Sequence, residues 1–549
     1  MTSIYSLPNE ILISICSQLG TPDLLHCAQV SQHFRELINN DALVQYRAEL
    51  NIHGMADVLQ EDLPVATKLR TLKLYEERFH LAAFHRTTLA NPGSDAGRTF
   101  TSFVSSDGSI LHFTRTQGSG SRCVVDKLPS TARSLRASRW TAPLPGIANM
   151  DVLAMDVSQN LTVAIEHSHD KEVLIHFVTA AAGQPHPLAA KPVLDATGTS
   201  ASVDGPDAYY HIQSVHISGT NVAWVIPGFN SEGLDTLQCW NWQTGLLVWE
   251  RQCDGLAGHT FLDSRFVLTV ARRGQEPILC IHDLESRADG GGDTTTEPVC
   301  RLELPRARAG VVEVVHVQAR AAADSRNADV PFVRDPMSTA VVLQLAVGRD
   351  TEGASSDIIV MIPHRTMYDQ IKEAIPSSCG NQADRVVEWD KWGLSGAVVL
   401  DLPPKALAAE NGGWFVPPDV WPQSFGSRLG LLLCDSPDIT SGFVVTVDIH
   451  PWASKCARRY SGHQGHSAHW GGLTGSSVDG PSPDVVRRLA SMPKNVASVA
   501  TNLSHALQVG SRIVFPPGQR PSQIITVHDG FAVAFEGDVS EVGLQVFTV

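Results

Sequence analysis

The chain has 549 residues, of which 43% are apolar and 18% charged, and its formal net charge is −15. This composition predicts a folded protein made of a small module and a large one, and it excludes a disordered chain. The acidic balance argues against a nucleic-acid-binding surface. We expect no membrane span, because no run of 18 apolar residues is found. We expect no signal peptide, because the N-terminal residues do not show the secretory leader pattern.

Residues 7–37 predict three short helices. Thr21 is expected to cap the second helix, whose first position suits Pro22, and Ser31 is expected to cap the third. The first helix carries an apolar stripe at helical spacing, formed by Ile11, Leu12, Ile15 and Leu19. So small a unit cannot bury all of its leucines by itself. The excess apolar surface predicts a partner.

This pattern resembles an F-box over residues 3–49, because the Leu-Pro-x-Glu-Ile-Leu opening, the Pro-Asp-Leu-Leu break and the Val-Ser-x-x-Phe close occur in that order. His33 and Phe34 depart only mildly from the family pattern. The resemblance implies binding to the Skp adaptor of a cullin–RING ubiquitin ligase. The residues that would face the adaptor, or hold the loops that do, are Leu7, Pro8, Ile11, Leu12, Ile15, Leu19, Pro22, Leu24, Leu25 and Val30. The alternative is an ordinary helical start of a larger core.

Residues 54 to about 90 keep a helical pattern, in which Glu76 and Glu77 are expected on a solvated face. The Asn91-Pro-Gly-Ser stretch ends this segment. We therefore divide the chain into an F-box at 1–50, a helical linker at 51–95 and a large all-β domain at 96–549.

Beyond residue 98 the sequence predicts short strands separated by turn residues. The clearest unit covers residues 237–249, a strand, a turn at Thr244-Gly245 and a second strand, and residues 265–270 and 278–284 repeat it. Further strands are expected at 339–347, 357–362, 396–400, 428–434, 442–448, 511–515 and 523–549.

Repeated antiparallel units of this kind predict a β-propeller. The 237–249 and 278–284 stretches resemble degenerate WD repeats, although the Gly-His signature is largely missing. The whole chain is also similar to divergent fungal F-box proteins with such a C-terminal module, through Val387-Glu-Trp-Asp-Lys-Trp, Gly426-Ser-Arg and Val447-Asp-Ile-His-Pro. To close the ring, the last strand at 542–549 is expected to pair near residues 99–114.

Loop insertions are expected near 286–298, 319–337 and 453–495. The last contains His463, His466 and His469, whose spacing matches no zinc signature, so a solvated loop is preferred to a metal site. No catalytic motif is present, and neither a metal nor another cofactor is predicted.

Tryptophans and one arginine pair also stand out in the strand-rich part of the chain. Six tryptophans lie in strand-like runs, where they are expected to fill blade interiors: Trp224, Trp240, Trp242, Trp249, Trp389 and Trp392. Arg272-Arg273 is placed in a blade loop and is read as a solvated turn, with a receptor for an acidic or phosphorylated motif as the weaker alternative.

The ten cysteines are scattered without a C-x-x-C pair, which predicts buried free thiols and a cytoplasmic or nuclear protein. The leading hypothesis is a non-catalytic, substrate-recognition subunit of an SCF (Skp–cullin–F-box) ubiquitin ligase, with an unknown target held by the propeller. The alternatives are an F-box scaffold that acts without a cullin, and a propeller-type metal-dependent enzyme.

Overall fold

The structure is a computed structural model of the whole chain. It describes residues 4–58, 63–80, 84–89, 103–106, 109–116, 120–130, 133, 135–144, 150–167, 173–196, 215–226, 234–273, 276–285, 297–306, 311–319, 330–348, 356–375, 386–402, 421–434, 441–453, 506–515, 519–527, 530–537 and 544–548.

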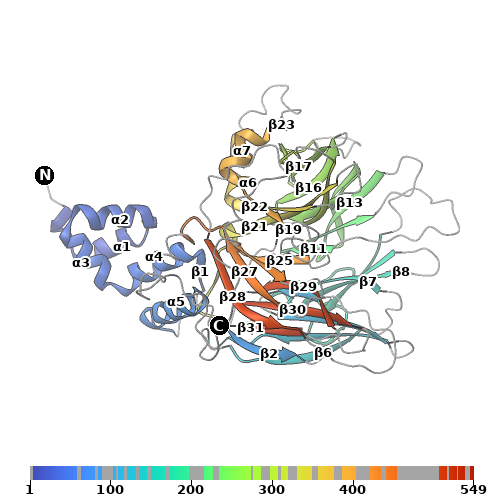
Figure 1. Ribbon diagram of the computed structural model, residues 1–549, viewed down its shortest axis with the longest axis horizontal. Helices are drawn as coiled ribbons and strands as arrows, with labels where there is room; N and C mark the ends of the chain where they lie inside the picture. Colours follow the sequence, from blue (N-terminus) through green and yellow to red (C-terminus); the bar gives the residue numbers. More distant parts are fainter. Residues whose placement is uncertain are drawn as a thin grey trace.

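The N-terminal part of the chain is helical, and its first three α-helices project away from the rest of the molecule (Figure 1). Ser31 caps α3 as predicted, since its side chain accepts a hydrogen bond from the Phe34 amide. The N-cap of α2 is Gly20, not Thr21, whose hydroxyl instead donates to the Ala48 carbonyl at 3.5 Å. The helices are η1 (Ile4–Ser6), α1 (Asn9–Cys16), α2 (Thr21–Val30), α3 (Gln32–Asn40), α4 (Ala42–His53) and α5 (Val65–His80).

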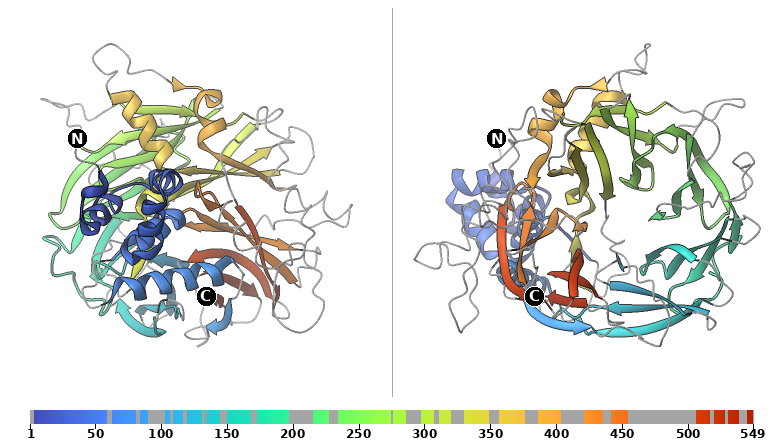
Figure 2. Two further views of the ribbon diagram at one scale, coloured as in Figure 1. Left: turned by 90° about the vertical axis from the view of Figure 1, so that its left-hand side faces the viewer. Right: turned by 45° about the vertical axis from the view of Figure 1, so that its right-hand side comes forward.

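A β-propeller follows, and its described strands form seven blades arranged in a ring (Figure 2, right). Blade 1 consists of β3 (Phe103–Ser106), β4 (Ser109–Thr116), β5 (Gly120–Lys127) and β6 (Ser138–Leu144). Blade 2 consists of β7 (Met150–Asp156), β8 (Leu161–His167), β9 (Val173–Thr179) and β10 (Val193–Asp195). Blade 3 consists of β11 (Val215–Ser218), β12 (Asn221–Ile226), β13 (Leu234–Asn241) and β14 (Leu246–Asp254).

Blades 4 to 6 continue in chain order. Blade 4 consists of β15 (Gly258–Phe261), β16 (Phe266–Arg273), β17 (Glu276–Asp283) and β18 (Cys300–Glu303), with β23 (Val386–Val387) added. Blade 5 consists of β19 (Val311–Ala319), β21 (Ala340–Gly348), β22 (Ser356–Pro363) and β24 (Val398–Leu402). Blade 6 consists of β25 (Trp421–Phe425), β26 (Arg428–Cys434), β27 (Ser441–Asp448) and β28 (Ala506–Val514).

Blade 7 combines the C-terminus with a strand from before the propeller. Its strands are β29 (Gln519–Val527), β30 (Gly530–Gly537), β31 (Leu544–Thr548) and β2 (His85–Leu89). The last strand pairs antiparallel with residues 85–89, and residues 103–106 and 109–114 pair within blade 1 instead. The partner expected for the closing strand was therefore wrong. The helical linker also ends earlier than expected, because helix stops at His80 and residues 85–89 are strand.

Each pair of neighbouring blades shares its own buried apolar cluster, which shows that the ring is closed. Leu111 and Met155 belong to the cluster between blades 1 and 2, and Ile110 and Val546 belong to the one between blades 1 and 7. The other interfaces have equivalent clusters. Because every blade is held on both sides by apolar contact, the ring forms one continuous scaffold.

The predicted hairpin at 237–249 is present as β13 and β14, joined at Gly245, which has φ 66°. Trp224, Trp242 and Trp249 are buried within blades as expected. Trp389 and Trp392 are buried too, but on a helix and not in strands. That helix, α7 (Trp389–Gly396), and α6 (His364–Ala374) lie between β22 and β24 and pack on the cluster between blades 4 and 5.

Two short elements connect the helical part to the propeller: β1 (Met55–Asp57) pairs antiparallel with β20 (Phe332–Arg334), which precedes the 3-10 turn η4 (Pro336–Ser338). Cys379, Cys456, His463, His466, His469 and most of the insertions at 286–298, 319–337 and 453–495 lie outside the described residues. The described cysteines are all free thiols. No helix among the described residues has both the length and the apolar character needed to cross a membrane.

Candidate adaptor-binding face

Helix α1 presents two different sides. Leu12 and Cys16, four residues apart, have no exposed surface, whereas Leu7, Ile11 and Ile15 are exposed by 39%, 48% and 41%. Side chains four apart lie one above the other on a helix, so Leu12 and Cys16 form one stripe of α1 and Ile11 and Ile15 form the other, with Leu7 just before the helix. One stripe packs into the helical unit and the other faces solvent.

Helix α2 repeats this division. Leu24 is buried, while Leu25 is 46% exposed and Val30 is 82% exposed. Isolated apolar side chains on a surface need no explanation, but several large ones on one small module are candidates for an interaction surface. We call this group the box face; it consists of Leu7, Ile11, Ile15, Leu25 and Val30.

The predicted adaptor-binding residues thus fall into two classes. Pro8 and Pro22 are exposed beside the box face, whereas Leu12 and Leu24 are buried and Leu19 is partly buried. These last three pack among the helices of the box, in a cluster completed by Cys16, Leu37 and Val44. They shape the box from within, and the exposed residues are the ones available to a partner.

Polar and apolar contacts attach the box to the propeller, and we call this region of contact the joint. Tyr46 on α4 places its hydroxyl 2.9 Å from Asp57 Oδ1 and 3.0 Å from the Pro331 carbonyl oxygen. Lys68 on α5 donates to Asp57 at 3.0 Å and to the Val58 carbonyl at 2.7 Å. Apolar side chains from both parts pack beneath these contacts: Tyr46, Leu50, Met55, Leu72, Tyr75, Phe79 and Phe332.

An ion-pair network is buried at the centre of this joint. Glu76 of α5 has no exposed surface and accepts a hydrogen bond from Arg428 Nη2 at 2.9 Å, and Arg428 Nε donates to Asp448 at 3.0 Å. The guanidinium carbon of Arg428 also lies 3.7 Å from the centre of the Phe79 ring. Because Arg428 and Asp448 belong to blade 6, this network fixes α5 to the propeller.

The pKa values in the joint follow from burial and charge together. Burial alone would raise the pKa of the Glu76 carboxyl, but Arg428 and other neighbouring cations hold it well below its usual range. Asp448 likewise has its pKa lowered to about 2, because Arg428 and Arg334 outweigh its burial. Burial would lower the pKa of Arg428, but Glu76 and Asp448 raise it. Both carboxyls are therefore ionised in the fold.

Two further residues shape the joint. Arg334 on β20 is fully buried and donates through Nη1 to the His53 carbonyl at 2.9 Å. Helix α4 ends at Gly54 with φ 62°, and a Cβ there would lie 2.8 Å from His450 Cδ2. Glycine is thus required both for the left-handed helix end and for the close approach of blade 6.

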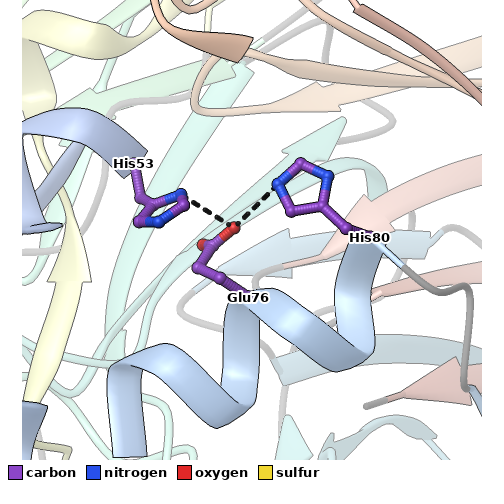
Figure 3. A group of neighbouring side chains, drawn as sticks. All are labelled: His53, Glu76 and His80. Atoms are coloured by element: carbon purple, nitrogen blue, oxygen red, sulfur yellow. Dashed lines mark ion pairs between the residues drawn. The ribbon is translucent and has the colours of Figure 1, made fainter. Parts of the chain in front are cut away.

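His53, Glu76 and His80 form the one group among the described residues with metal-ligand geometry (Figure 3). His53 Nδ1 and His80 Nε2 lie 3.3 and 3.6 Å from the same oxygen, Glu76 Oε2. That oxygen already accepts from Arg428, and the second buried guanidinium, Arg334, also acts on it. A divalent cation there would be repelled by both arginines. We therefore interpret the group as part of the ion-paired joint.

Reasoning from sequence missed this joint. Glu76 was expected on a solvated face and is fully buried. The signal was present in two of the motifs behind the family resemblance, because Gly426-Ser-Arg supplies Arg428 and Val447-Asp-Ile-His-Pro supplies Asp448. Helical periodicity could not reveal that a glutamate more than 300 residues earlier meets them.

A family model described as F-box-like matches residues 4–47. A comparison with curated proteins found no match. Among solved structures, a chain of the Chaetomium thermophilum Polycomb Repressive Complex 2 is 12% identical with a TM-score of 0.39, and the match covers 84% of this chain and 97% of that one. The WD40 domain of SCAP from fission yeast is 8% identical with a TM-score of 0.32, over 85% and 98% of the two chains.

Proposed function

Because the chain carries an F-box-like domain ahead of a seven-bladed propeller, we propose that it is the substrate-recognition subunit of an SCF-type ubiquitin ligase. In this proposal the F-box binds the Skp adaptor, and through it a cullin, while the propeller binds a target protein. The observation that carries it is the box face, an exposed apolar surface on a helical module that projects from the ring (Figure 1).

The adaptor would be bound by the box face together with the exposed prolines Pro8 and Pro22. Burial of apolar surface is the main driving force of such contacts, at roughly 25 cal/mol per Å². Leu12, Leu19 and Leu24 would contribute indirectly, by fixing the spacing of α1 and α2. Removing one exposed residue should therefore weaken binding without unfolding the box.

The rigid joint between box and propeller also supports the role of a substrate receptor. A substrate receptor accelerates ubiquitin transfer by holding the target near the conjugating enzyme, which raises the effective concentration of the reacting groups. That requires a defined distance between box and propeller. The buried Glu76–Arg428–Asp448 network supplies a fixed connection, and β2 ties the same segment into blade 7.

Three of the described cysteines are unsuited to thioester chemistry. Burial, followed by Cys27, raises the pKa of Cys16, and burial raises the pKa of Cys123 and Cys239 to about 12. A thioester-forming ligase needs an accessible thiol with a lowered pKa, which these are not. Free buried thiols also support a cytoplasmic or nuclear location.

The direct test is co-purification. Wild-type protein expressed with adaptor and cullin should purify with both, whereas Ile11→Glu/Ile15→Glu should lose them, since two carboxylates would have to be buried at the interface. The matched control is Leu188→Glu, which changes a 62% exposed apolar residue on the propeller and should leave binding intact.

The outcomes separate the competing functions. A wild-type protein that purifies without adaptor contradicts the proposal, provided that its melting temperature shows it is folded. Adaptor present with cullin absent would instead indicate a scaffold that works outside the ligase.

A further inference from the structure

Five large apolar side chains are exposed on the outer rim of the ring, where blades 2 and 3 meet. Three follow one another at the start of β14, the last strand in the sheet of blade 3: Leu246, Leu247 and Val248 are exposed by 62%, 39% and 39%. The other two belong to blade 2, where Leu188 is exposed by 62% just before β10 and Val193 by 46% on it. Clustered exposed apolar residues are candidates for an interaction surface. We call these five residues the rim patch.

Backbone and side-chain contacts bring the two halves of the rim patch together. The Ala190 amide donates to the Gln243 carbonyl at 2.8 Å. The Lys191 side chain passes so close to Gly245 that a Cβ there would lie 3.0 Å from Lys191 Cδ. These contacts join the segment before β10 to the turn before β14. The five apolar side chains therefore belong to one surface that spans both blades.

A β-bulge explains why three consecutive side chains of β14 face solvent. Cys239 pairs with Trp249 but Trp240 pairs with Leu247, so Val248 is an extra residue on the outer strand. Alternate residues of a regular strand point to opposite faces, and a bulge breaks this alternation. A bulge also interrupts the edge of a sheet and disfavours the addition of a further strand. A partner of the rim patch therefore contacts its side chains and does not extend the sheet.

Two residues of opposite charge lie at the two ends of the apolar run of β14. Lys191 is exposed beside Gly245, before the run, and Glu250 lies two residues after it. Glu250 accepts a hydrogen bond from Gln238 Nε2 at 3.0 Å. Within the described part of the chain, Lys191 and Glu250 form no ion pair. The run thus has a positive end and a negative end, and both charges are available to a partner.

We propose that the rim patch binds the rim patch of a second copy of this chain. In a two-fold symmetric contact the same surface is used twice, so that residue i meets residue j and j meets i. Two antiparallel copies of the run bury Leu246, Leu247 and Val248 against their equivalents. The same arrangement places Lys191 of each copy beside Glu250 of the other. Apolar burial and matched charges together give the complementarity that a self-contact requires.

The position of the rim patch leaves the box of each copy free. The joint fixes the box to blade 6, whereas the rim patch lies on blades 2 and 3. Blades 4 and 5 separate the two on one side of the ring, and blades 1 and 7 on the other. Figure 1 shows β7, β8 and β13, which mark blades 2 and 3, on the side away from α1–α3. The two boxes of the dimer therefore point outward. This self-association goes beyond the proposed function and does not depend on it.

The test is sedimentation velocity of the purified full-length protein at several concentrations. The wild-type protein should sediment as a dimer at about 10 µM and above. Leu247→Glu/Val248→Glu should abolish the dimer, because carboxylates from both copies would be buried together in the contact. Leu188→Glu, on the blade 2 side, should weaken it at least about tenfold for the same reason. The melting temperature of each variant shows whether it is folded.

A charge exchange distinguishes the two-fold contact from other ways of associating. Lys191→Glu alone and Glu250→Lys alone should each weaken the dimer at least about tenfold, since like charges then face each other. Lys191→Glu/Glu250→Lys should restore it, because the same pairs form again with their signs reversed. The matched control is the box-face variant Ile11→Glu/Ile15→Glu, which removes the other exposed apolar group and should leave the dimer intact.

A wild-type protein that stays monomeric up to about 100 µM would overturn the proposal and leave the rim patch to a different protein. Dimers that survive Leu247→Glu/Val248→Glu, or that are lost in Ile11→Glu/Ile15→Glu, would also overturn it, because another surface would then be responsible. So would a double exchange that fails to restore the dimer. Adaptor binding by the same preparations shows separately whether the proposed function holds.

Discussion

Replacing Arg428 by methionine is expected to destabilise the full-length protein by about 3–5 kcal/mol, because it leaves Glu76 and Asp448 buried without their main cation. The change also removes the contact between the Arg428 guanidinium and the Phe79 ring. The measurement is urea unfolding, followed by tryptophan fluorescence and by circular dichroism.

The matched control for this change is Arg306→Met. Arg306 forms an ion pair with Glu276 at 3.1 Å, but both side chains are more than half exposed, so its loss should cost at most about 1 kcal/mol. Glu76→Gln added to Arg428→Met should cost less than the sum of the two single changes, because the pair is already broken. A destabilisation below about 1 kcal/mol for Arg428→Met would show that the joint is not held by this network.

The same variant separates stability from adaptor binding. The apolar cluster of the box contains Leu12, Leu24 and Leu37 and none of the joint residues. Arg428→Met protein that is still folded should therefore bind the adaptor normally but support slower ubiquitination of a bound target, because the box is no longer held at a fixed distance from the propeller.

Lowering the pH from 7.5 to 5 is expected to destabilise the protein by several kcal/mol. Five buried histidines, His80, His259, His282, His364 and His450, have their pKa lowered to between about 3 and about 4, chiefly by burial. They stay neutral in the fold at pH 5, whereas the unfolded chain protonates them near pH 6.5. The unfolded state thus binds more protons, and each contributes up to about 1.4 kcal/mol per pH unit.

This dependence is measured by urea unfolding at pH 7.5, 6 and 5 at constant ionic strength. His364→Gln should reduce the slope by about one proton. Equal stability at pH 7.5 and 5 would contradict the assignment of these histidines as neutral.

The joint carboxyls act in a separate, more acidic range. The pKa values of Glu76 and Asp448 are lowered in the fold, so their contribution is complete above about pH 5 and is lost as the pH falls from there, for Asp448 towards about 2. Loss of stability between pH 7 and 5 therefore belongs to the histidines, and loss below pH 5 belongs in part to the joint.

The sequence was sufficient where structure is determined by neighbours along the chain. The capping of α3 by Ser31 and the Gly245 turn between β13 and β14 both depend on residues within a few positions of one another. The F-box and the propeller architecture could be predicted for this reason, because each is built from short units with local signals.

Long-range contacts explain what the sequence did not reveal. Residues 85–89 carry a helix-like pattern but pair with β31, more than 450 positions later, so the ring closes with a strand assigned to the linker. Trp389 and Trp392 suit a strand by composition, yet tertiary packing places them on α7 against the cluster between blades 4 and 5. The burial of Glu76 depends on Arg428, which no local pattern connects to α5.

Hydrogen–deuterium exchange of the purified protein, alone and mixed with purified adaptor, tests the central claim most directly. If the box face is the docking surface, adaptor should slow exchange in residues 9–16 and 21–30, while the strands of the propeller exchange as before. The contradicting result would be a complex that protects the propeller and leaves α1 and α2 unchanged, or a folded protein on which adaptor has no effect at all.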